Sequence, residues 1–138
     1  NRASLSRRST AADVLLIDTP PGDPGTQSAA AGRADLVIVP AEPAPMEVSR
    51  VWATVDALGQ SVPAVVLLAR VDPRTTLLAE TIEALDDEGV PHFATTIPAR
   101  TDYKRMPGTW PTATSRRTAE LLAPWAQLAA EIEEMSAE

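Results

Sequence analysis

Short runs of consecutive apolar residues recur along the chain and predict buried β-strands. Four such runs span residues 14–17, 36–39, 64–69 and 93–97, and the last of them is the weakest. Apolar and polar residues do not alternate within these runs, as they would in a strand with one face in water. Unbroken runs of this length are typical of strands buried on both faces of a parallel sheet.

The segments between these runs have the spacing of apolar residues that is typical of helices. Apolar residues recur at steps of three and four over residues 48–58 and 78–85, and a glycine follows each stripe. A shorter helix is predicted over about residues 25–33, and a last helix carries the apolar stripe of residues 121–132. Pro124 should kink that last helix or mark the start of its main part.

This alternation of strands and helices predicts βαβ units with right-handed crossovers. We expect an α/β domain of three layers, in which a parallel sheet carries helices on both faces. The length of 138 residues suits one domain, with residues 1–12 as a polar lead-in and residues 13–138 folding together. Trp52 and Trp125 lie on the helical apolar stripes and are expected in the core.

The amino-acid composition excludes or disfavours several classes of function. The chain has no cysteine and one histidine, which excludes disulfides, thiolate zinc sites and cysteine nucleophiles and disfavours a histidine-based triad. Its 12 basic and 19 acidic residues give a net charge of −7, which argues against coating nucleic acid with the whole surface. No apolar run approaches the ~18 residues of a membrane span. No signal-peptide pattern occurs at the start, so we expect a cytoplasmic protein without membrane contact.

The segment with the most specific pattern is A-D-V-L-L-I-D-T-P-P-G, residues 12–22. Its apolar run delivers the carboxylate of Asp18 to the carboxyl end of a predicted strand, where ligands bind in α/β sheets. A carboxylate in that position can hold a hydrated Mg²⁺ beside nucleotide phosphates. The same pattern also begins an ordinary turn, so the residues of this segment leave both interpretations open.

The order of four segments resembles the ParA/MinD family of partition and positioning ATPases, and most closely its ParA-type branch. These segments are D-V-L-L-I-D-T-P-P-G, A-D-L-V-I-V-P, A-V-V-L-L-A-R-V-D-P-R-T and T-T-I-P-A-R, within a resemblance from about residue 12 to 135. The resemblance implies a P-loop NTPase-like fold in which the first segment is the Walker B strand. Asp18 would then bind Mg²⁺ through water, and Thr19, Pro20 and Gly22 would belong to the switch that follows.

The resemblance also implies where the adenine of ATP or ADP would lie. In the family, the base contacts the end of the strand written here as Ala69 and Arg70, and the loop written here as Pro98, Ala99 and Arg100. Members commonly have Thr or Asn where this chain has Ala69, so a side-chain hydrogen bond to the base would be absent.

Charged residues near two predicted strand ends are further candidates. Arg70, Asp72 and Arg74 flank a proline turn, where they can form an ion pair or contact nucleotide or a second subunit. ParA-type members bind DNA non-specifically through basic residues after the later strand. The positions that match here are Arg100, Lys104, Arg105, Arg116 and Arg117. Such a patch suits salt-sensitive phosphate contacts, and the alternative is that these are solvated loop charges.

The chain departs from the family in the phosphate loop. It contains no Gly-Lys pair, and Lys104 is its only lysine. The phosphate-loop strand, the loop and its helix would lie before Asn1, so we do not expect these residues alone to hydrolyse ATP. In the family fold that strand lies between the segments at 13–18 and 36–39. Its removal would leave a vacant lane, filled by a lost N-terminal part or a partner chain, or a rearranged sheet.

The function that the resemblance implies is partition of a plasmid or chromosome on the nucleoid. Its elements are an ATP-dependent homodimer, non-specific DNA binding and hydrolysis stimulated by a centromere-binding partner protein. One alternative is a non-catalytic α/β interaction module that has lost the phosphate loop. Another is a MinD-like positioning ATPase, which is disfavoured because residues 124–138 hold four Glu and no basic residue, unlike a basic membrane-surface helix.

Overall fold

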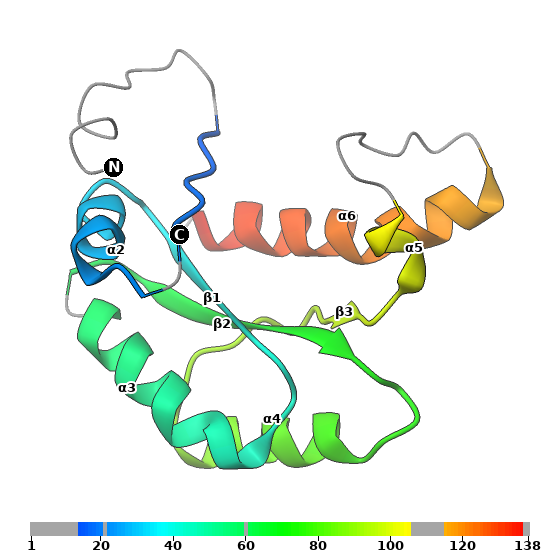
Figure 1. Cartoon of the computed structure of the whole chain (residues 1–138), viewed down its shortest axis with the longest axis horizontal. Helices are drawn as coiled ribbons and strands as arrows, with labels where there is room; N and C mark the ends of the chain where they lie inside the picture. The colour runs from blue at the N-terminus through cyan, green and yellow to red at the C-terminus, as the bar shows by residue number, and fades with distance from the viewer. Residues whose placement is uncertain (1–13, 21, 60, 106–114, 137–138) are drawn as a thin grey trace.

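The sheet consists of three parallel strands in the order β1-β2-β3 (Figure 1). The computed structural model describes residues 14–20, 22–59, 61–105 and 115–136. The strands are β1 (Val37–Ala41), β2 (Ala64–Val71) and β3 (Ile97–Pro98). The register of β1 against β2 runs from Val37 opposite Ala64 to Ala41 opposite Leu68. The predicted parallel α/β architecture is confirmed.

Helices cover both faces of this sheet. The helical elements are α2 (Pro24–Ala31), the 3₁₀ turn η1 (Pro45–Glu47), α3 (Val48–Gly59), α4 (Leu77–Asp87), α5 (Thr101–Lys104) and α6 (Arg116–Ser136). Figure 1 shows α3 and α4 on one side of the strands and α6 on the other. The helices expected over residues 25–33, 48–58 and 78–85 are confirmed, with small differences at their ends.

β2 is the central strand, and its first five residues are buried. Val66 and Leu68 belong to the core cluster that includes residues of α3 and α4. Val65 and Leu67 belong to a second cluster, which includes residues of α6. Burying a side chain of this size stabilises a fold by about 1.5–3 kcal/mol. The two faces of β2 therefore hold the helices of both layers.

The strand predicted over residues 14–17 is wrong for this structure. These residues belong to no strand, and Val14 and Leu16 are 76% and 87% exposed. The physical reason is the lack of a neighbour, since a strand is held by hydrogen bonds to an adjacent strand and by burial of its faces. Among the described residues β1 pairs only with β2, so its other edge carries no strand in this part of the chain.

Two further expectations need correction, and the structure decides between the alternatives for Pro124. The run at 93–97 forms only the two-residue β3 and an isolated bridge between His92 and Val66. α6 continues through Pro124, so no separate helix begins there; Figure 1 shows it changing direction in its first third. Trp52 and Trp125 are 43% and 37% exposed rather than buried in the core.

Glu131 explains why the chain before β3 does not extend the strand. The backbone N–H groups of Ala94 and Thr95 donate to its two carboxylate oxygens at 2.6 and 3.0 Å. Burial alone would raise the pKa of Glu131, but these donors outweigh it and the pKa lies below its ordinary value. α6 is thereby attached to a segment more than thirty residues earlier in the chain.

Replacing Glu131 tests this attachment. We expect Glu131→Gln to lower the free energy of unfolding by about 1–2 kcal/mol, because one N–H group loses a charged acceptor. The native contribution is complete above pH 4.5, the ordinary pKa, and disappears as the pH falls through the lower folded-state pKa. Urea unfolding between pH 3 and 7 measures both effects. The exposed neighbour substituted as Glu134→Gln is the control, and equal losses in the two variants would contradict the assignment.

Candidate functional site

The carboxyl ends of the three strands meet at one edge, where ligands bind in open α/β sheets. Ala69 and Arg70 lie at the end of β2, and residues 98–100 follow at the end of β3. The N–H of Ala99 donates to the carbonyl of Val71 at 2.8 Å, which joins the two strand ends. The structure therefore brings together all five residues predicted to surround the base.

Arg70 has an unusual backbone at this edge. Its φ is +57°, in the left-handed region, and the pairing of β2 with β3 is irregular between Ala69 and Val71. A non-glycine residue in this conformation costs about 1–2 kcal/mol. Its guanidinium contacts the Glu42 carboxylate at 2.7 Å, with the side chains 67% and 61% exposed, and such exposed pairs stabilise little. The strained turn directs Arg70 across the carboxyl edge toward the end of β1.

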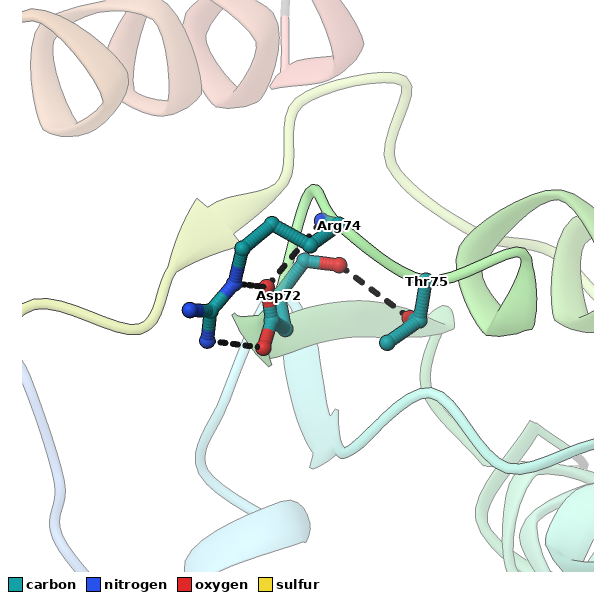
Figure 2. A network of polar contacts seen from close by, with 3 residues as sticks. All are labelled: Asp72, Arg74 and Thr75. Atoms are coloured by element: carbon teal, nitrogen blue, oxygen red, sulfur yellow. Dashed lines mark hydrogen bonds and ion pairs between the residues drawn. The ribbon is translucent and has the colours of Figure 1, made fainter.

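The loop after β2 is ordered by its own ion pair (Figure 2). The Nε and Nη2 atoms of Arg74 donate to the two carboxylate oxygens of Asp72 at 2.9 and 2.7 Å. The backbone N–H of Arg74 also donates to Asp72, and the Thr75 hydroxyl donates to the Asp72 carbonyl at 3.2 Å. The side-chain and backbone donors of Arg74 lower the pKa of Asp72 to about 2. The ion-pair alternative predicted for this turn is confirmed for Asp72 and Arg74.

Residues of the predicted Walker B segment lie elsewhere. Asp18, Thr19 and Pro20 belong to an irregular segment, and Gly22 stands in a turn with φ +74° just before α2. Figure 1 shows residues 14–20, in dark blue, leading toward α2 and far from the arrowhead of β2. The described structure thus does not bring Asp18 to the edge that carries Ala69 and Arg70.

A complete Mg²⁺–ATP site is not assembled by the described residues. No cluster of three or more His, Cys, Asp or Glu side chains occurs among them. A phosphate cradle needs converging backbone N–H groups at a glycine-rich turn before a helix, and the chain has no Gly-Lys pair for such a loop. The described residues therefore supply no such cradle for a triphosphate at the carboxyl edge.

The five predicted DNA-contacting residues are all exposed, but they differ in their partners. Arg117 forms an ion pair with Asp102 at 2.5 Å, and Arg116 pairs with Glu120 at 3.0 Å. Within the described part of the chain, Arg100, Lys104 and Arg105 form no ion pair, so their charges are free for a phosphate backbone. The long loop predicted at 98–114 contains α5, and its residues 106–114 lie outside the described residues.

Tyr103 holds α5 against α6. Its hydroxyl donates to the carbonyl of Leu121 at 2.8 Å. Its ring meets Trp125 edge to face, with ring centroids 6.0 Å apart. These two contacts fasten α5 to α6 beside Lys104 and Arg105.

Comparison with known proteins identifies a relative. No family model matches the chain. The Maintenance of carboxysome distribution protein A of Gloeobacter kilaueensis is 35% identical to it over 98 residues. The chain is a distant homologue of a ParA-type ATPase. The match covers 67% of this chain but only 44% of the relative, so the chain spans less than half of that protein.

This homology confirms the predicted relationship to the ParA/MinD family.

Three residues that form or support the carboxyl edge could not be predicted from the sequence: Glu42, Tyr103 and Glu131. The residues that Tyr103 and Glu131 contact lie 18 to 37 positions away in the sequence, and no local sequence pattern predicts such contacts. No helix among the described residues is long and apolar enough to cross a membrane.

The pKa of Asp72 provides a direct test of the ordered loop. We expect this carboxyl to titrate near pH 2 in the native chain and, in Arg74→Ala, at a value closer to its ordinary 3.8, because the guanidinium donors are removed. The pair stabilises the fold above pH 3.8, and that contribution vanishes as the pH falls toward 2. Carboxyl-carbon NMR titration measures the value. Arg50→Ala is the control, and a native Asp72 that titrates at 3.8 would refute the loop geometry.

Proposed function

We propose that this chain forms the carboxyl-terminal portion of a ParA-type ATPase that distributes a cargo within the cell. The observation that carries the proposal is the homology over 98 residues to a protein whose name specifies carboxysome distribution. That name supports a positioned cellular body as cargo and gives no support to a plasmid or chromosome. ATP and Mg²⁺ binding, a homodimer, nucleoid DNA and a partner protein on the cargo belong to this proposal.

The open edge of β1 supports completion by another segment. Val37 donates its N–H to the carbonyl of Pro63, on the side of β2, so Ile38 directs its N–H and its carbonyl to the open side, where Pro40 offers a carbonyl alone. The apolar residues 14–17, of which the first three are exposed, have a strand-like composition but no strand neighbour among the described residues. A phosphate-loop strand in the vacant lane would pair with β1 on one side and with residues 14–17 on the other. It would also move Asp18 to the carboxyl edge.

A non-catalytic interaction module is the second candidate function. The observation that favours it is the separation of the segment at residues 14–20, which contains Asp18, from the arrowhead of β2 (Figure 1). In this alternative the vacant lane is filled by a partner strand and no nucleotide binds. Both candidates share the same fold and differ in whether phosphates are held.

Nucleotide titration separates the two candidates. We expect the 138-residue chain to show no saturable binding of a fluorescent ATP analogue with Mg²⁺, because it lacks a phosphate cradle. A longer protein that includes a phosphate-loop segment upstream should bind it, and Asp18→Asn in that protein should remove the dependence on Mg²⁺. The exposed Asp35, substituted as Asp35→Asn, is the matched control. Tight binding by the short chain, or none by the longer protein, would contradict the proposal.

Salt-dependent DNA retention tests the basic residues around α5. Replacing Arg100, Lys104 and Arg105 with Ala should flatten the plot of log affinity against log salt, by about 0.9 for each DNA phosphate that the variant no longer neutralises. Replacing Arg116 and Arg117 should have a smaller effect, since both already pair with carboxylates.

Arg50→Ala is the control for this series, because α3 lies on the opposite face of the sheet from α6 (Figure 1). An unchanged salt slope in the triple variant would reject a role for these residues in DNA binding. A slope that also changes in Arg50→Ala would indicate a diffuse charge effect rather than a patch.

A further inference from the structure

A single carboxylate lies within the basic segment that joins α5 to α6. Over residues 100–117 the sequence has five basic residues, and Asp102 is the one acidic residue. Asp102 belongs to the single turn of α5, which Arg100 precedes and Arg105 follows. The backbone N–H of Arg105 donates to the carbonyl of Asp102 at 3.0 Å. The negative charge of Asp102 is therefore carried by the same helical turn as the bases proposed to contact DNA.

The Asp102 carboxylate holds Arg117. The Nη2 atom of Arg117 donates to Oδ1 of Asp102, and the two residues lie fifteen positions apart in the sequence. The side chain of Asp102 is 27% exposed, whereas that of Arg117 is 72% exposed. Arg117 therefore reaches solvent with one of its donors already occupied. The adjacent carboxylate also repels any phosphate that approaches the remaining donors.

The attachment of α5 to α6 has other contacts besides this ion pair. The Tyr103 hydroxyl donates to the carbonyl of Leu121, and the Tyr103 ring meets Trp125 edge to face. An ion pair with a largely exposed arginine adds little to such an attachment. Removal of the Asp102 charge should therefore change the electrostatics of this surface while α5 keeps its place.

The other ion pair of this segment is more open to water. Arg116 and Glu120 are neighbours on α6, and their side chains are 94% and 56% exposed. Solvent and salt screen a pair of this kind more strongly than one with a partly buried carboxylate. Asp102 is thus the acid with the firmer hold on a base of this surface.

We propose that Asp102 limits the affinity of this surface for DNA, because its carboxylate competes with phosphate groups for Arg117. The inference rests on the proposed DNA binding by the residues around α5. A phosphate that uses Arg117 has to displace the carboxylate, whereas Arg100, Lys104 and Arg105 form no ion pair within the described part of the chain. The contact between Asp102 and Arg117 is therefore autoinhibitory and keeps the binding weak and readily reversible.

Salt-dependent retention on a DNA duplex of random sequence tests this proposal with the 138-residue chain. Asp102→Asn should tighten binding and steepen the plot of log affinity against log salt by about 0.9, because one more phosphate is neutralised. Between about 50 and 200 mM salt, this slope corresponds to an additional loss of affinity of about three- to fourfold. Arg117→Ala alone should change the slope little. In the double variant, the effect of Asp102→Asn should disappear.

Glu134→Gln is the matched control, since it also removes one negative charge from the chain but lies about 26 Å along α6 from Arg117, at 1.5 Å per residue. An unchanged near-ultraviolet circular dichroism spectrum confirms that Tyr103 and Trp125 keep their contact. Equal steepening in Glu134→Gln, or steepening by Asp102→Asn that persists in the Arg117→Ala background, would overturn the proposal in favour of a general charge effect.

The triple replacement of Arg100, Lys104 and Arg105 distinguishes failure of this inference from failure of the proposed function. If the triple variant flattens the plot and Asp102→Asn leaves it unchanged, DNA binding stands and the competition for Arg117 is wrong. If neither variant changes the slope, the proposed DNA binding by this surface is wrong, and the role of Asp102 is rejected with it.

Discussion

Burial of β2 on both faces is the constraint on which this structure depends. Val66 and Leu68 face one helical layer, Val65 and Leu67 face the other, and β1 and β3 flank the strand on either side. A central strand of this kind cannot turn either face to water, so helices are required on both sides. It also fixes where the carboxyl edge lies, and therefore where Arg70 and the loop after β2 are presented.

Whether an apolar run forms a strand in this structure depends on whether an adjacent strand is present to pair with it. Residues 64–69 and 14–17 have similar composition, and both are predicted as strands from the sequence. Only the first has partners on both sides, and the second is exposed in an irregular segment. The run at 93–97 was shortened because Glu131 accepts the N–H groups of Ala94 and Thr95. Apolar composition predicts that a segment can be a strand, while pairing depends on chain that lies elsewhere.

The same distinction applies to the candidate site. Topology alone places Ala69, Arg70 and residues 98–100 at one edge, because parallel strands end together. Asp18 was assigned to that edge through a strand that does not form among the described residues. The left-handed backbone of Arg70 coincides with the irregular pairing of β2 with β3, and its Glu42 partner follows another strand, so neither feature has a local sequence signature.

The net charge of −7 does not show that basic and acidic residues are separated between the two ends of α6. α6 begins with Arg116 and Arg117 and carries Glu133 and Glu134 near its end, with no acid in its first turn and no base in its last. Helix dipoles favour the reverse order, by about 0.3–1 kcal/mol for each charge at an exposed end. The fold therefore retains a charge distribution that weakens its longest helix.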